Sequence, residues 1–213
     1  MRAERNKKAM LLSHYTENLV EAGCDEAGRG CLAGPVFAAA VILPRGFRNE
    51  VLTDSKQLTK LQRSRLRDII ESKALSWAVS RVDAPVIDQI NILNASILAM
   101  HQAIAHLKTP PELLLIDGNR FKPCQGIPHL CIVRGDGKYL SIAAASVLAK
   151  THRDDFMIRI HEEYPLYDWI NNKGYPCKKH RAEILRSGIT PFHRISFRMS
   201  EQLSLHWENC PKS

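Results

Sequence analysis

Asp25-Glu26-Ala27-Gly28-Arg29-Gly30 is the most informative segment of the chain, because two adjacent acids run into a turn that holds an arginine between two glycines. The apolar residues from Leu19 to Cys24 predict a short strand that stops at the acids. Active sites of α/β sheets gather at strand ends. The stretch therefore predicts carboxylates beside a loop whose backbone can approach a phosphate closely.

Two further acids follow apolar runs in the same way. Residues 113–116 have the composition of a fully buried strand and stop at Asp117, and the run 130–133 stops shortly before Asp136. If these strands lie side by side, both acids converge with the first pair on one patch. Like charges at that distance repel, and protonation or a hard divalent cation such as Mg²⁺ or Mn²⁺ relieves the repulsion.

Each acid also has a simpler interpretation when it is taken alone. Asp25 and Glu26 could cap the N-terminus of a helix. Asp117-Gly118 and Asp136-Gly137 are common turn sequences. Only the occurrence of all four acids after apolar strands favours a shared metal site.

The composition favours one domain and a nucleic-acid partner. The chain has 213 residues, and 30 basic against 22 acidic residues give a net charge of +8. The surface should therefore attract phosphate, although many basic proteins bind no nucleic acid.

The six cysteines include no C-x-x-C pair, and we find no secretory leader, so we expect a cytoplasmic protein without a zinc site or disulfides. The longest apolar run, 31–44, is too short to cross a bilayer, so we expect no membrane association. Since no long apolar stripe is apparent, we expect a monomer.

Hydrophobic periodicity predicts the order of the elements. Strands are expected at about 19–24, 36–43, 75–82, 113–116 and 130–133, and helices at 59–73, 87–107 with a break near Asn91, and 140–163. In the segment 75–82, apolar residues alternate at Leu75, Trp77 and Val79. This order predicts an α/β fold with a mixed five-stranded sheet covered by helices. We expect an N-terminal extension over 1–19, a core over 20–163, and a small, mainly helical C-terminal lobe over 164–213.

Taken together, the motifs resemble bacterial ribonuclease HII. They run in one order over about residues 20–200: DEAGRG at 25–30, DSKQL at 54–58, NILNAS at 91–96, IDGN at 116–119, RGD at 134–136, AAASVLAK at 143–150, KGYP at 173–176 and HRISF at 193–197. The resemblance implies a ribonuclease H-like fold and a divalent metal cofactor, Mn²⁺ or Mg²⁺. It also implies endonucleolytic cleavage of the RNA strand of RNA/DNA hybrids and of duplex DNA on the 5′ side of embedded ribonucleotides. The products would carry 3′-hydroxyl and 5′-phosphate ends.

The resemblance also implies which residues perform the chemistry. It assigns Asp25, Glu26, Asp117 and Asp136 as the active-site carboxylates that bind the metal. In a two-metal site, one cation activates the attacking water and the other neutralises charge on the leaving oxygen. Glu26 raises a geometric difficulty, since neighbours on a regular strand point to opposite faces, and a bend near Gly28 would remove it.

Substrate recognition must read a 2′-hydroxyl to distinguish ribose from deoxyribose. The resemblance assigns this contact to Gly28, Arg29 and Gly30, and it adds Tyr175 from the KGYP motif. Lys56 is a candidate phosphate contact, and further candidates are Lys150, Lys173 and Arg194.

Some positions depart from the family pattern or have two interpretations. Cys177 stands where threonine is expected, and Arg198 stands where glycine is usual. His180 could protonate the leaving group, contact phosphate or form a structural hydrogen bond. Asp154 could be a fifth acid near the metal, but an ion pair is preferred.

Two other functions are compatible with parts of the pattern. One is a DNA nuclease on the same fold, which would not need the Gly28–Gly30 loop and Tyr175 to sense a 2′-hydroxyl. The other is a non-catalytic nucleic-acid-binding module, which would not need all four acids.

Overall fold

The structure is a computed structural model, and it describes residues 11–49, 51–52 and 58–197. Its strands are β1 (Glu21–Ala27), β2 (Val36–Ile42), β3 (Ser76–Val82), β4 (Leu113–Asp117) and β5 (His129–Ile132). Its α-helices are α1 (Lys60–Lys73), α2 (Ala84–Ala105), α3 (Leu140–Glu163), α4 (Trp169–Asn172) and α5 (Lys178–Ser187), and short 3₁₀ turns are η2 (Gly135–Gly137) and η3 (Pro165–Tyr167).

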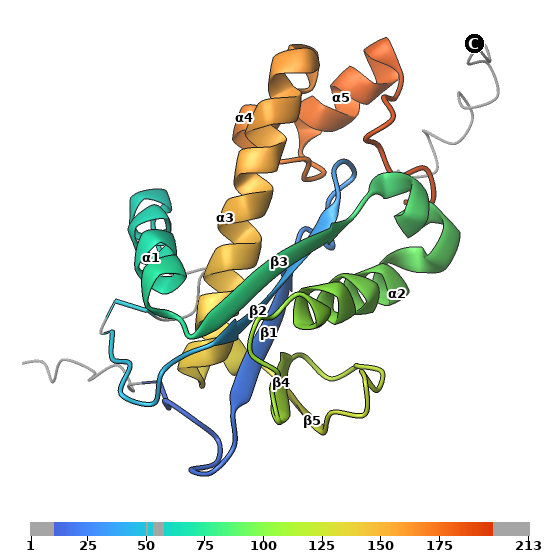
Figure 1. The fold of residues 1–213 in the computed structure, drawn as a ribbon. Helices are drawn as coiled ribbons and strands as arrows, with labels where there is room; N and C mark the ends of the chain where they lie inside the picture. Colours follow the sequence, from blue (N-terminus) through green and yellow to red (C-terminus); the bar gives the residue numbers. More distant parts are fainter. Residues whose placement is uncertain (1–10, 50, 53–57, 198–213) are drawn as a thin grey trace, which may run out of the picture. The chain divides into compact units, whose positions relative to one another are not determined.

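The strands form one five-stranded sheet in the order β3-β2-β1-β4-β5. β1 pairs with β4 in parallel, and β4 pairs with β5 in parallel, so these three strands lie side by side (Figure 1). This confirms the predicted mixed sheet with flanking helices. The partly helical segment after residue 163 is confirmed as well.

The chain divides into two compact units, each made of separate stretches. The first unit comprises Met1–Asp25, Ala40–Trp77 and Leu107–Val147, and the second comprises Glu26–Ala39, Ala78–His106 and Leu148–Ser213. The expected division at residues 19/20 and 163/164 stays a prediction.

The first unit is built around β4. Leu113 and Leu115 pack with Ile142 in a buried cluster, as the apolar run had predicted. Gly23 of β1 lets the start of α3 approach closely, because a Cβ there would lie 2.2 Å from the carbonyl carbon of Ser141. The tight packing fixes β1 against the helix that follows the acids.

The second unit has an aromatic core. Phe37, Phe156, Tyr167 and Trp169 belong to one buried cluster, and Trp169 is fully buried. In α2, Asn91 has a φ of 64° and interrupts the helix, which confirms the expected break. The Asn94 N–H donates to the Oδ1 of Asn91 at 3.1 Å, so the asparagine caps the second part of the helix.

Three strands differ from their predictions in detail. β1 does not stop at the acids but continues through Ala27. In β3 the more buried face carries Ser76 and Ala78 rather than the apolar residues at 75, 77 and 79, and Leu75 is 60% exposed. β5 lies at the edge of the sheet, so its residues are only partly covered and Cys131 is exposed. Local periodicity predicted these strands but not which side the rest of the protein covers.

Within the described ranges, the structure contains no helix that is both long and apolar enough to span a membrane.

Candidate active site

The structure places two of the predicted acids, Asp25 and Asp117, on neighbouring strands of the first unit, and it ties the turn that carries Asp136 to the end of β4. In the β1–β4 register Cys24 lies opposite Ile116, so Asp25 and Asp117 follow as the next residues of the two parallel strands. Asp117 also registers with Ile132 of β5. The backbone N–H of Gly135 donates to the Oδ1 of Asp117 at 2.6 Å, which ties the η2 turn containing Asp136 to the end of β4.

Two of the acids are shielded from solvent. Asp25 and Asp136 are each 5% exposed, although aspartate is seldom buried unless it has partners. The turn that carries Asp136 begins after Arg134, which has a left-handed φ of 56°. A residue other than glycine is held in that conformation only when its surroundings determine it, and such strain collects at functional sites.

The donor chemistry fits Mg²⁺ or Mn²⁺, although the acids do not form a complete cage. Among the described residues, no group of three or more His, Cys, Asp and Glu side chains is arranged to hold a metal ion by itself. Mg²⁺ commonly binds through one or two carboxylates together with substrate phosphate oxygens and water. Asp25 within β1 and Asp117 at the end of β4, neighbours on parallel strands, offer such a pair.

Glu26 differs from the other acids. It lies within β1, and the strand remains regular through Ala27, so the expected bend comes after Glu26 rather than at it. Its Oε1 pairs with the Nη1 of Arg29 at 3.0 Å, and its side chain is 12% exposed. Its share in a metal site stays a prediction.

The Gly28–Gly30 loop requires glycine at its first position. Gly28 has a φ of 92°, and a Cβ there would lie 2.0 Å from the Nε of Arg153. At Gly30, by contrast, a Cβ would meet nothing within 4 Å. Arg153 is 2% exposed and donates to the carbonyl oxygens of Ala33, Pro35 and Lys173 at 2.9–3.1 Å. A buried guanidinium thus holds the chain that follows the loop.

Arg194 holds the loop itself. It is 3% exposed, and its guanidinium donates to the carbonyl oxygens of Gly28 at 2.8 Å, Arg29 at 2.9 Å and Gly34 at 2.7 and 2.9 Å. Burial lowers the pKa of Arg194 to about 10, which leaves it charged at neutral pH. The predicted phosphate contact by Arg194 is therefore wrong, since its planar donors are used inside the protein.

The arginine determines which way the loop's amides point. In a trans peptide the C=O and N–H bonds point in opposite directions. Because the Gly28 and Arg29 carbonyls face the guanidinium of Arg194, the N–H groups of Arg29 and Gly30 point away from it. The loop therefore presents two neighbouring backbone donors on its outer side.

Tyr175 belongs to the same unit as the loop. The residue is partly exposed, at 44%, and its side chain is hydrogen-bonded to Cys31, the residue after Gly30. The N–H groups of Leu32 and Ala33 donate to the carbonyl of Gly174 at 2.8 and 3.3 Å. The KGYP segment and the loop are thus joined by backbone and side-chain contacts.

The other candidate residues have varied outcomes. Lys56 lies outside the described residues. Lys150 pairs with Asp154 at 3.9 Å, which confirms the preferred ion pair, and the ammonium of Lys173 donates to the carbonyl of Ile170. His180 is fully buried, which supports a structural hydrogen bond over a contact with phosphate or a leaving group.

The cysteines beside the acids are core residues. Cys24 and Cys31 are fully buried, and burial raises the pKa of both thiols above its ordinary value. They are held as neutral thiols and not as reactive thiolates.

The sequence analysis missed Arg153 as a loop anchor. A signal was present, because Arg153 follows the alanine-rich start of α3 on the helix face that also carries Ser146 and Ala149. A long charged residue on a buried helix face usually has a fixed internal partner. Its partners, however, lie about 120 residues away, at Ala33 and Pro35.

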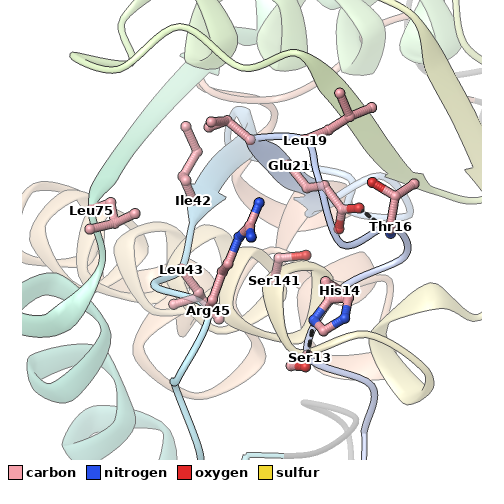
Figure 2. A pocket seen from close by; sticks show the side chains of 11 residues that line it. Ser13, His14, Thr16, Leu19, Glu21, Ile42, Leu43, Arg45, Leu75 and Ser141 are labelled. Carbon is pink, nitrogen blue, oxygen red and sulfur yellow. Dashed lines mark hydrogen bonds between the residues drawn. The ribbon is translucent and has the colours of Figure 1, made fainter.

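A small cavity lies elsewhere in the first unit. Figure 2 shows it at the start of β1, where Glu21 accepts from the backbone of Thr16 and His14 contacts Ser13. Its volume is about 80 Å³. Asp25 is four residues further along β1, about 13 Å at the rise of a strand. The cavity is therefore separate from the acids.

Comparison with known proteins adds independent information. A family model described as Ribonuclease HII matches residues 22–200. A Ribonuclease HII of Phocaeicola vulgatus is 64% identical over 190 residues, which cover 89% of this chain and 94% of that protein. A Ribonuclease HII of Bacteroides thetaiotaomicron is 62% identical and covers 93% of this chain and 100% of that protein.

Solved structures agree with the fold. The ribonuclease H2 of Pyrococcus horikoshii superposes with a TM-score of 0.74 at 22% identity, covering 89% of this chain and 99% of that one. The RNase HII of Archaeoglobus fulgidus, solved with PCNA, gives a TM-score of 0.71 at 25% identity, covering 85% and 96%. The Bst-RNase HIII solved with Mn²⁺ gives 0.61 at 19% identity, covering 83% and 66%.

Proposed function

The chain belongs to the ribonuclease HII family and is a phosphodiester hydrolase, and from this premise we propose which residues cut which bond. The proposed reaction is hydrolysis of the RNA strand of RNA/DNA hybrids, and of duplex DNA on the 5′ side of an embedded ribonucleotide. The products carry 3′-hydroxyl and 5′-phosphate ends. The observation that carries the proposal is the register that places Asp25 beside Asp117, with η2 bonded to Asp117.

The proposed metal ligands are Asp25, Asp117, Asp136 and Glu26, with Mg²⁺ or Mn²⁺ as the cofactor. When bound, the divalent cation supplies charge neutralisation at the scissile phosphate and lowers the pKa of a coordinated water. The chain's own part is to hold the carboxylates in place. The Gly135 N–H fixes the orientation of Asp117, and burial of Asp25 and Asp136 limits competing water.

We propose that the outer side of the Gly28–Gly30 loop and Tyr175 together form the site that recognises the ribose. The N–H groups of Arg29 and Gly30 face away from the buried Arg194, so they are oriented to donate to a sugar hydroxyl or a phosphate oxygen. The ring of the half-exposed Tyr175 offers a flat apolar face to a sugar or base. A rigid site of this kind loses little entropy on binding.

The proposal is tested by nicking of a labelled DNA duplex that contains one ribonucleotide, with Mg²⁺, with Mn²⁺ and with EDTA. We expect a metal-dependent cut on the 5′ side of the ribonucleotide by the wild-type chain. Asp25→Asn should slow the cut by at least about 100-fold, because a metal centre contributes several kcal/mol of charge stabilisation. An all-DNA duplex should stay intact.

A matched control is Asp68→Asn, which removes an exposed acid of α1 by the same chemical change. It should nick at the wild-type rate. Cleavage of the all-DNA duplex would instead support the DNA-nuclease alternative, and binding without cleavage in either metal would support a non-catalytic module.

We also propose that the enzyme acts as a monomer. Light scattering should give a mass near 24.1 kDa, and a concentration-independent value of twice that mass would contradict it.

A further inference from the structure

Two histidines of the second unit are buried against each other. His180 of α5 is fully buried and His193 is 4% exposed, and their Nε2 atoms are 3.2 Å apart. Histidine is seldom fully buried, and a buried ring nitrogen needs a partner. The partners of these rings determine where each proton lies.

The direction of the hydrogen bonds between the two rings follows from two neighbouring groups, a backbone N–H and an indole N–H, that can donate but cannot accept. The backbone N–H of Thr190 donates to the Nδ1 of His193 at 2.9 Å, so the neutral ring carries its proton on Nε2. That proton can only be donated to the Nε2 of His180. The indole N–H of Trp169 also donates to this atom, at 3.1 Å, so two independent donors require the Nε2 of His180 to be an acceptor.

The proton of His180 is therefore on Nδ1, and it points at one acceptor. The Nδ1 lies 3.0 Å from the carbonyl oxygen of Tyr175. A directed chain runs from Thr190 through His193 and His180 to the main chain of Tyr175. Burial lowers the pKa of both histidines, which keeps the two rings neutral, as the chain requires.

We propose that His180 and His193 are positioning residues that set the main chain of Tyr175 and, through it, the ring that contacts the substrate. The inference rests on the proposed function. The same carbonyl accepts from the N–H of Cys177 at 2.8 Å, and the N–H of Tyr175 donates to Asn172 at 2.9 Å. The backbone of Tyr175 is thus held from the core side, while the residue as a whole is 44% exposed.

The geometry excludes a direct chemical role for His180. Both of its ring nitrogens are engaged within the core, and none of its surface reaches solvent. A group that protonates a leaving oxygen must lie within hydrogen-bond reach of that oxygen. His180 acts through Tyr175 or only fills space, and these two roles can be separated.

Two substitutions divide the functions of the ring. His180→Asn places an amide N–H where Nδ1 was, so it keeps the donor to Tyr175 and loses the acceptor. His180→Gln places an amide oxygen where Nε2 was, so it keeps the acceptor for Trp169 and loses the donor. We expect kcat/KM for nicking at a single ribonucleotide to fall about tenfold further in His180→Gln than in His180→Asn, the worth of one hydrogen bond.

A double-mutant cycle tests whether the effect passes through Tyr175. In a Tyr175→Ala background, the difference between His180→Gln and His180→Asn should vanish, because the positioned ring is gone. Equal losses in the two single variants, or a difference that persists without the tyrosine ring, would overturn the proposal.

A second measurement needs no activity. Long-range ¹H–¹⁵N NMR of the wild-type chain should show His180 as the Nδ1–H tautomer and His193 as the Nε2–H tautomer. An Nε2–H or doubly protonated His180 at neutral pH would overturn the proposal even if both variants failed to fold. Absence of nicking by the wild-type chain would refute the proposed function instead, and the tautomers would still decide whether the chain of hydrogen bonds exists.

Discussion

Replacing Arg194 by lysine should test the role of the buried guanidinium most sharply, because the charge is kept and only the planar fork is lost. Arg194 makes four hydrogen bonds to three carbonyl oxygens, those of Gly28, Arg29 and Gly34. A lysine ammonium is a single point of donation and cannot reach three carbonyls arranged around a fork. Hydrogen bonds to a charged group contribute about 1.5–3 kcal/mol each, so losing one or two of them should cost about 3 kcal/mol of unfolding free energy.

Urea unfolding measures this loss directly. The midpoint should fall while the m-value stays constant, since the same surface is exposed on unfolding. Nicking should slow as well, because the released carbonyls allow the loop amides to rotate. Arg186→Lys is the matched control, since the Arg186 side chain is 68% exposed and should change the unfolding free energy by less than about 0.5 kcal/mol. An Arg194→Lys chain as stable and active as the control would refute the reasoning.

Three further predictions follow from the structure. Cys177 is the N-cap of α5, and its Sγ accepts a backbone N–H at only 3.5 Å, so Cys177→Thr should raise the unfolding free energy by about 0.5–1 kcal/mol; an unchanged urea midpoint would contradict this. Gly28→Ala should destabilise by at least about 2 kcal/mol, since its Cβ would overlap Arg153 at a φ of 92°, while Gly30→Ala should be nearly neutral in the same thermal unfolding assay. Burial lowers the pKa of His193 from 6.5 to about 3, so below pH 6.5 the unfolded chain binds a proton that the folded chain does not. Stability from this group is complete above pH 6.5 and falls by up to about 1.4 kcal/mol per pH unit towards pH 3. His193→Gln should flatten that dependence, and an equally steep profile would argue against a buried neutral ring.

The sequence was most informative where local chemistry decides the structure. The helix expected over 59–73 is confirmed as α1, which begins at a capping box formed by Thr59 and Gln62 and buries Leu66 and Ile70. The helix expected over 140–163 matches α3 at both ends. The break near Asn91 was predicted, and its left-handed φ explains it.

The sequence-based predictions failed where contacts between residues far apart in the chain determine the structure. Apolar and polar residues alternate along the β3 sequence, but the other segments of the protein bury Ser76 and leave Leu75 exposed. Arg194 had the appearance of a phosphate ligand beside a motif, yet its partners lie 160–166 residues earlier and only folding brings them together. No local sequence pattern reveals that a charged side chain will donate its hydrogen bonds to backbone carbonyls.

Part of the candidate site was predictable because it depends only on which strands pair. Residues that are opposite each other on adjacent parallel strands lie near each other, so pairing β1 with β4 was enough to place Asp25 beside Asp117. The position of Asp136 depended on a 3₁₀ turn that follows an exposed edge strand, which strand periodicity could not show.

Anomalous diffraction from crystals grown with Mn²⁺ and a duplex carrying one ribonucleotide would test the shared carboxylate site most directly. We predict a Mn²⁺ peak within coordination distance of both Asp25 and Asp117. The account would be contradicted if the substrate were bound and Mn²⁺ were absent from these two carboxylates. It would also be contradicted if Mn²⁺ were bound only to acids distant from both.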